Sequence, residues 1–267
     1  MEVKMPLSSS DMADLAHAKT LLENPSLAAK MTALIGTPIE KSMDFLPPKL
    51  SAALQKSTMT AMRSALRFAL FTMGRKMKPR AANRFHKGLA AACGGVGGAF
   101  GLPALVAEIP LSTVVMLRSI ADIARSEGEM VGDIRVRLAC LEVFALSGRT
   151  GADDAADTGY FAVRAALAQS ISEAAKYIAE KGVADKGAPA LVRLIAQIAA
   201  RFNVAVSQKV AAQTIPLIGA AGGLLINMIF IDHFQKMARG HFIIRRLERK
   251  YDKIVIREAY DALDIRG

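Results

Sequence analysis

The stretch GLAAACGGVGGAFGLPALVAEIP, residues 88–110, bears most directly on the fold, because it is apolar, rich in glycine and uncharged from Gly88 to Ala107. Five of its glycines lie within eight positions: Gly94, Gly95, Gly97, Gly98 and Gly101. A dinucleotide-binding loop needs G-x-G-x-x-G between a strand and a helix. The third glycine is missing from that spacing here, and no strand pattern precedes the run. The stretch is therefore not typical of a phosphate-binding loop.

The glycines fit the spacing of closely packed helices instead. Pairs four residues apart occur at Gly94/Gly98 and Gly97/Gly101, and again at Gly219/Gly223 in a second apolar run, which also holds Gly222. Such pairs lie on one helix face, where glycine lets a neighbouring backbone approach closely. Glycine inside a helix costs about 1 kcal/mol relative to alanine. The pattern therefore indicates either close packing of two Gly-rich apolar helices or a break or hinge.

Two uncharged runs, residues 88–107 and 210–231, reach the length of about 20 residues that spans a bilayer. Each contains a proline, Pro103 or Pro216, and the second also contains Gln213 and Asn227. Three interpretations stay open: two buried core helices, a membrane-inserting hairpin that can open, and constitutive spanning.

Composition predicts an all-α protein. The 267 residues are 52% hydrophobic but only 6% aromatic, without tryptophan, and no period-2 strand pattern or fixed-period repeat is present. We expect a single multi-helix bundle-like domain over 25–260, a helical extension at 1–24 and a tail at 261–267. A capping box at Thr37-Pro38-Ile39-Glu40 predicts a helix start at Thr37. Helices are expected at 8–23, 37–46, 49–78, 112–128, 135–146, 160–181, 188–212, 215–238 and 239–252.

Positive charge is concentrated before the first apolar run. The net charge is +11, and RKMKPRAANRFHK, residues 75–87, holds the densest cluster: Arg75, Lys76, Lys78, Arg80, Arg84 and Lys87. A basic cluster next to an apolar helix is typical of a segment that binds anionic cytoplasmic lipid, although a solvated basic face has the same composition. No aromatic interleaving or nucleic-acid-binding motif accompanies it, so nucleic acid is not an expected partner.

The N-terminus has no secretory signal pattern, and the two cysteines, Cys93 and Cys140, lie in apolar helical context. We expect buried free thiols in a reducing compartment. The protein is therefore expected to be cytoplasmic or peripheral to the cytoplasmic face of the inner membrane.

Several polar residues lie in or beside the apolar segments. Glu108 needs a partner if it is buried, and Arg118 follows ten residues later; we expect an ion pair with a basic residue of another helix. Asn227 is expected to hydrogen-bond across to the first Gly-rich helix. Asp232 and His233 are further candidates for buried polar contacts, although a surface pair or a metal or base pair also fits them.

Catalytic and metal-binding motifs are not found. The four histidines show no HExxH or Cys-His ligand spacing, and no serine lies in G-x-S-x-G or S-x-x-K. No cofactor or metal is expected. The alternative of a hydrolase-like enzyme would need Glu108, Asp232, His233 and His241 to cluster, although His233 and His241 are eight residues apart and about 80° out of register on a helix.

The chain resembles the EcsC family of bacterial proteins. The resemblance rests on GTPIEKSMDFLP (36–47), GGVGGAFGLPALVAEIPLSTVVMLRSIADIARSEGE (94–129), LACLEVFALSG (138–148) and AAQTIPLIGAAGGLLINMIFIDHFQKMARGHFIIRRLER (211–249). Family members often have FALGG where this chain has FALSG, so Ser147 indicates a small change at that helix end. The resemblance implies an all-helical protein, cytoplasmic or at the inner face of the membrane, linked to transport, secretion or lipid-associated processes. It supplies no catalytic residues.

These observations favour a non-enzymatic, membrane-proximal helical protein that binds an anionic membrane surface or a lipid-like ligand. The hydrolase-like enzyme is one alternative. A soluble scaffold for an acidic protein partner, such as a membrane transport protein, is the other.

Overall fold

The structure is a computed structural model that describes residues 7–23, 26–73, 102–147, 159–182, 188–214 and 219–264, with backbone only at 102–105 and 219–221. These residues form helices and no strand, which confirms the predicted all-α fold for this part of the chain. The helices are α1 (Ser9–Glu23), α2 (Leu27–Ile35), α3 (Ile39–Asp44), α4 (Pro48–Phe71), α6 (Leu102–Ser126), α7 (Ile134–Leu146), α8 (Tyr160–Lys181), α9 (Pro189–Gln213), α10 (Gly219–Tyr251) and α11 (Lys253–Ala262).

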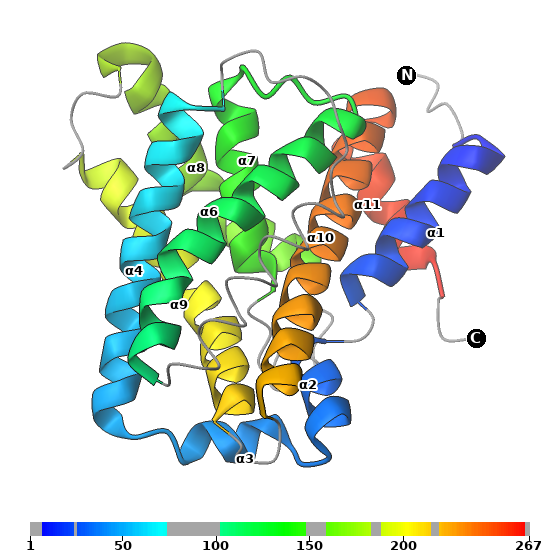
Figure 1. Cartoon of the computed structure of the whole chain (residues 1–267). Coiled ribbons are helices and arrows are strands. Elements are labelled where there is room, and N and C mark those ends of the chain that lie inside the picture. Colours follow the sequence, from blue (N-terminus) through cyan, green and yellow to red (C-terminus); the bar gives the residue numbers. More distant parts are fainter. Residues whose placement is uncertain are drawn as a thin grey trace.

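The α7 helix lies in the middle of the structure, in contact with α4, α6, α8, α9 and α10 (Figure 1). Every residue from Leu138 to Leu146 is buried, as expected for a helix that other helices cover on all sides. The Phe144 ring lies 5.0 Å from that of Phe202 in α9 and 5.4 Å from that of Phe234 in α10, measured between centroids. These aromatic contacts join the three central helices.

The buried thiol expected at Cys140 is present in the same helix. Cys140 is free and has no exposed surface. Burial raises the pKa of its thiol to about 12, so the reactive thiolate is disfavoured at neutral pH. Cys93 lies outside the described residues.

The start of α3 differs from the predicted capping box. The helix begins at Ile39 after Pro38, and no side chain caps it. The backbone N–H of Ile39 donates instead to Oγ1 of Thr32, at 3.1 Å. Thr32 belongs to α2, a helix that the sequence did not lead us to expect, and α2 begins where the Ser26 side chain accepts from the N–H of Ala29. The prediction that Thr37 caps α3 is therefore wrong.

Pro110 lies inside α6, where we expected one apolar helix to end and another to begin. Proline has no N–H, so the carbonyl of Val106 loses its partner in the helix. The Ser57 hydroxyl of α4 donates to that carbonyl at 2.6 Å. A neighbouring helix thus satisfies the carbonyl, and α6 continues without a break from Leu102 to Ser126.

The second apolar run, 210–231, is divided between two helices. The α9 helix ends at Gln213 and α10 begins at Gly219, so this run is not one continuous span. Within the described chain, α9 is the one helix that is long and apolar enough to cross a membrane, with 44% of its most apolar stretch buried. A core helix of a soluble protein meets the same two conditions, so this finding alone does not place α9 in a membrane.

The α10 helix continues through Gly240, where two shorter helices were expected. A Cβ atom added at Gly240 would lie 2.7 Å from Cγ of Leu22 and 3.0 Å from the carbonyl oxygen of Ala18, both in α1. The glycine therefore allows α1 to approach α10 closely rather than breaking the helix. The contact is visible where α1 crosses beside α10 (Figure 1).

Polar contacts add to the docking of α1. The Lys19 ammonium donates to the carbonyl oxygens of Tyr260 and Leu263, at 2.8 and 2.7 Å, at the end of α11. Asp11 Oδ2 accepts from Lys250 Nζ and from the Tyr251 hydroxyl, both at 2.6 Å. The segment that we expected to be an N-terminal extension is thus packed against the last two helices.

We predict that Gly240→Ala destabilises the protein. Alanine gains about 1 kcal/mol of helix propensity over glycine, but the clash with Leu22 and Ala18 exceeds this gain, so the net loss is about 1–2 kcal/mol. Urea denaturation measures the difference. Gly132→Ala is the control, because its Cβ would meet nothing within 4 Å. Equal stability of the two variants would contradict the close contact between α1 and α10.

Candidate functional site

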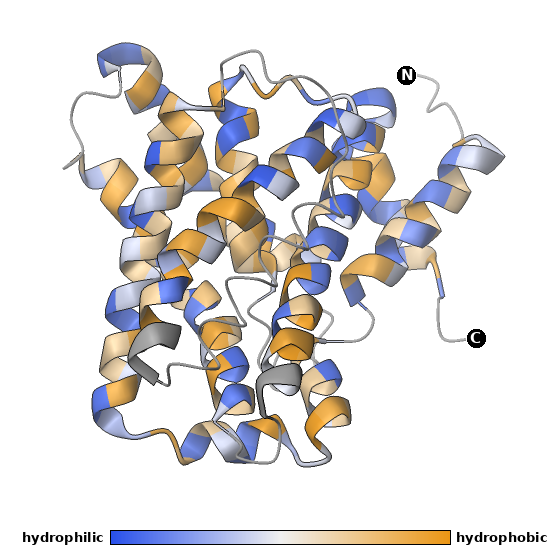
Figure 2. Cartoon of the chain, in the orientation of Figure 1, coloured by the Kyte–Doolittle hydropathy of each residue, from blue (hydrophilic) through white to orange (hydrophobic). Residues whose placement is uncertain are grey.

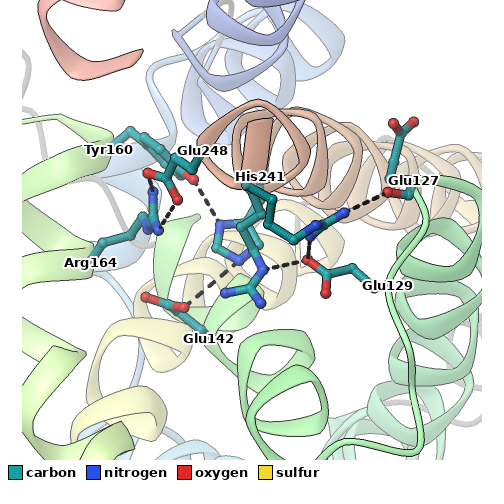
Figure 3. A network of polar contacts seen from close by, with 9 residues as sticks. Glu127, Glu129, Glu142, Tyr160, Arg164, His241 and Glu248 are labelled. Carbon is teal, nitrogen blue, oxygen red and sulfur yellow. Dashed lines mark hydrogen bonds and ion pairs between the residues drawn. The ribbon is translucent and has the colours of Figure 1, made fainter. Parts of the chain in front are cut away.

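A buried polar network joins α10 to α7 and α8 (Figure 3). His241 of α10 has no exposed surface, and its Nδ1 lies 2.9 Å from the hydroxyl of Tyr160, the first residue of α8. Its Nε2 lies 3.7 Å from Oε2 of Glu142 in α7. The second distance is too long for a hydrogen bond, so the Glu142 carboxyl is a close neighbour of the imidazole but is not bonded to it. We call Glu142, Tyr160 and His241 the buried triad.

Ion pairs flank the buried triad (Figure 3). Arg164 of α8 donates to both carboxylate oxygens of Glu248, at 2.7 and 2.9 Å. Arg245 donates to Glu129 at 2.8 Å, and Glu129 follows the end of α6. Bidentate and charge-assisted contacts of this kind are the strong ones in proteins. They attach α8 and the α6–α7 connection to the C-terminal half of α10.

Burial decides which groups of the triad are charged. It raises the pKa of the Glu142 carboxyl to about 7, against the opposing effect of Arg164 and Arg245. It also lowers the pKa of His241 well below its ordinary value, and the two arginines act in the same direction. At weakly acidic pH, Glu142 therefore holds a proton and His241 is neutral, which avoids two buried charges.

The buried triad combines groups used in acid–base catalysis, but it is closed to solvent. Glu142 and Tyr160 are each 5% exposed and His241 is 0% exposed. A substrate in solution cannot touch these atoms without separation of the helices. We therefore assign the network to the packing of α7, α8 and α10. Within the described ranges, no three His, Cys, Asp or Glu side chains are grouped so that they could hold a metal ion.

Glu108 is buried in α6 and pairs with Lys209 of α9, at 3.0 Å between Oε1 and Nζ. The Lys209 ammonium also lies 5.2 Å from the centroid of the Phe230 ring. Lys209 did not stand out in the sequence, because a lone lysine in an amphipathic helix gives no sign of its burial. Arg118, a candidate for such a buried contact, is exposed on α6; that prediction is wrong, because its position on the helix faces solvent.

The remaining polar candidates have different surroundings. Asp232 is not buried: its side chain is 34% exposed and pairs with Lys236, one turn further along the solvent-facing side of α10, at 2.9 Å. Asn227 is fully buried, but the first Gly-rich run to which we expected it to bond lies outside the described residues. His233 is buried and lines a cavity of about 10 Å³ together with Ser147.

The hydrolase-like arrangement does not form from these residues. His233 and His241 lie on one continuous helix, about 12 Å apart along its axis. Glu108 is held by Lys209, and Asp232 by Lys236. Ser147, which differs from the family pattern, ends α7 with φ −86°, so no glycine is required at this position.

The glycines and the basic cluster that we singled out are described only in part. Gly219 is the first residue of α10, and Gly222 and Gly223 are buried in it. The other residues lie outside the described ranges: Gly94, Gly95, Gly97, Gly98, Gly101, Arg75, Lys76, Lys78, Arg80, Arg84 and Lys87. The pairing of the two Gly-rich runs therefore stays a prediction.

An apolar groove of about 110 Å³ lies between α4 and α9. Its lining consists of apolar side chains and two arginines: Met59, Arg63, Leu66, Arg67, Leu70 and Phe71 from α4, and Leu191, Val192, Ile195 and Ala196 from α9. Phe71 and Val192 are 59% and 49% exposed. An open apolar surface next to fixed cations is suited to an amphipathic anion.

Arg63 and Arg67 also belong to a row of basic residues along α4, which we call the basic stripe: Lys49, Lys56, Arg63 and Arg67. All four are exposed, and their spacing places them within about 40° of one another around the helix. Hydrophilic and hydrophobic residues alternate along α4 (Figure 2). The spacing of seven, seven and four residues is the sequence signal of this stripe.

We predict that Lys209→Met destabilises the protein by about 3–5 kcal/mol, because it leaves the Glu108 carboxylate buried without its cation. The double variant Glu108→Leu/Lys209→Met removes both charges and should recover most of this loss. Chemical denaturation of the wild type, the two single variants and the double variant gives the coupling. Additive losses would contradict a buried ion pair at this position.

We also predict that Glu142→Gln changes the pH dependence of stability. The pKa of Glu142 is about 7 in the folded protein and about 4.3, the ordinary value, in the unfolded chain. Between these pH values the folded state holds a proton that the unfolded state has lost. The contribution of Glu142 to the free energy of unfolding therefore falls as pH rises through this interval. Neutral His241 contributes a stability that rises with pH up to about 6.5. When the Glu142 carboxyl is removed, only the rising contribution of His241 remains. Unfolding free energy measured against pH should therefore climb more steeply in the variant than in the wild type.

The matched control is Glu180→Gln, because Glu180 is 56% exposed in a surface pair with Lys176. Its curve should follow that of the wild type. A Glu142→Gln curve that also follows the wild type would show that Glu142 is ionised in the folded protein throughout this range.

Comparison with known proteins identifies a family for this chain. The model of the EcsC protein family matches residues 4–247, from the start of α1 through most of α10. No curated protein and no solved structure matches the chain. The matched region contains the buried triad, the basic stripe and the groove. Because the match covers most of its length, the chain belongs to the EcsC protein family.

Proposed function

We propose that this protein is a non-enzymatic, membrane-proximal protein that binds the anionic cytoplasmic face of the membrane through α4. The observation that supports the proposal is the basic stripe of Lys49, Lys56, Arg63 and Arg67, on a helix that contains no Asp or Glu. Each Lys or Arg near an anionic lipid surface contributes about 1 kcal/mol to binding. A row of four such residues on one side of a helix favours a flat, negatively charged partner.

Several basic residues of α10 have acidic partners in other parts of the fold. In α10, Arg245 pairs with Glu129, Arg246 with Asp14 and Lys250 with Asp11. Within the described part of the chain, no ion pair involves any residue of the basic stripe. The packing of the helices therefore does not account for these four cations, and their charge is free to attract an external anion.

The chain continues the same charge bias after α4. Residues 75–87 hold six further Lys or Arg and no Asp or Glu. Because the cytoplasmic leaflet carries the negative surface potential, the proposal places the protein at that face. An accessory role for a membrane transport protein is compatible with that position.

We predict that Lys56→Gln/Arg63→Gln weakens binding to phosphatidylglycerol vesicles about thirtyfold, since two contacts of about 1 kcal/mol each are lost. Co-flotation of the protein with vesicles at low salt measures the binding. Neutral phosphatidylcholine vesicles should bind little protein, and high salt should release the bound fraction because it screens exposed charges.

The charge-matched control is Lys253→Gln/Arg257→Gln in α11, where both residues are exposed and distant in sequence from α4. It removes the same net charge and should float like the wild type. Equal loss in both variants would reduce the effect to net charge alone, and the absence of flotation with anionic vesicles would refute membrane binding.

A further inference from the structure

We propose that the groove between α4 and α9 takes one acyl chain of an anionic phospholipid, with the lipid phosphate held by Arg63 and Arg67. This inference rests on the proposed membrane binding and adds to it a defined lipid site. In this proposal, α4 makes more than a general electrostatic contact with the membrane. One lipid molecule extends partly out of the bilayer, and its acyl chain lies in the groove.

The shape and lining of the groove fit a hydrocarbon chain. The lining residues of α4 run from Met59 to Phe71, about 18 Å at the rise of an α-helix, and those of α9 from Leu191 to Ala196, about 8 Å. Its α9 side is formed by Leu191, Val192 and Ile195, and α9 contains no acidic residue. The two walls of the groove are the neighbouring helices α4 and α9: Thr58 of α4 contacts Asn203 of α9, and Phe71 and Leu191 both line the groove.

Exposure of the apolar lining indicates that the groove is a binding surface. Phe71 and Val192 are 59% and 49% exposed, and each leaves apolar area in contact with water at a cost of about 25 cal/mol per Å². Contiguous apolar area on a monomer commonly marks an interaction site. An acyl chain would cover this area without requiring a hydrogen bond from the groove.

The charges select an anionic head group. Arg63 and Arg67 are one helical turn apart, so their side chains are neighbours on one face. No carboxylate in the described ranges pairs with either guanidinium, and neither α4 nor α9 contains Asp or Glu. The guanidinium fork matches a phosphate in a bidentate contact. An acidic peptide would satisfy the arginines but not the hydrocarbon lining.

The position of the arginines identifies the membrane as the source of this lipid. Arg63 and Arg67 belong both to the rim of the groove and to the basic stripe that continues through Lys56 and Lys49. The groove therefore opens on the side of α4 that would face the anionic surface. A lipid of that surface can enter without crossing water as a free monomer.

Fluorescence quenching tests the site, because the chain has no tryptophan of its own. Val192→Trp places a single reporter in the groove. The control reporter is Ala52→Trp, at an exposed position on α4 about 60° from Lys49 of the basic stripe and outside the groove. Each variant is mixed with phosphatidylglycerol vesicles whose acyl chains carry bromine, which quenches a tryptophan in contact with the chain. The same samples are floated to measure membrane binding.

The expected result is strong quenching of Val192→Trp and weak quenching of Ala52→Trp at equal flotation. Addition of Ala196→Phe fills the groove from an exposed position of α9 and should abolish the quenching while flotation continues. Flotation with no difference between the two reporters overturns the acyl-chain site and leaves the proposed membrane binding intact. Failure to float overturns both.

A further arm uses monomeric bromododecyl phosphate without vesicles. Quenching by this monomer together with no quenching by the vesicles would assign the groove to a soluble amphiphile and overturn the membrane lipid as its occupant. Inorganic phosphate, which has the charge but no chain, should not compete with the vesicles at equal concentration.

Discussion

A buried charge or imidazole in a helical interior must have a partner, and this requirement determines how the helices meet along α10. An unpaired buried charge costs several kcal/mol, and three polar residues in the C-terminal half of α10 contact polar groups from other parts of the chain. Arg245 meets Glu129, His241 meets Tyr160 and Glu142, and Glu248 meets Arg164. Together these contacts fix the register of α10 against α7, α8 and the end of α6.

Burial of apolar side chains drives the helices together, and these polar contacts select one register among the possible packings. The phenylalanines of α7, α9 and α10 would pack in several registers, because apolar contact is not directional. A carboxylate that has to reach one particular cation is far more selective. Glu108 and Lys209 fix α6 against α9 in the same way, and Ser57 fixes α4 against the carbonyl that Pro110 leaves free. The two arrangements show polar contacts serving the fold.

The α4 helix differs from this pattern on its outer side. Its inner residues pack into the core, but its exposed cations form no ion pair with any residue that the structure describes, and the groove beside them is apolar. The buried triad has the more varied chemistry, yet it is enclosed and links helices. The groove has simple chemistry and lies open to solvent. Accessibility, more than the reactivity of individual side chains, therefore distinguishes a candidate binding site from an internal link in this fold.

Sequence alone determined that the chain is helical and where most helices lie. The predicted span 160–181 coincides with α8, that at 135–146 differs from α7 by one residue at its start, and that at 188–212 differs from α9 by one residue at each end, because helix periodicity and end signals are local. The tertiary structure alone decided what depends on distant contacts. It made α10 continuous at Gly240, where α1 packs closely, carried α6 through Pro110, and paired Glu108 with Lys209. Local sequence cannot specify such contacts, because each depends on a side chain or backbone atom from a remote part of the chain.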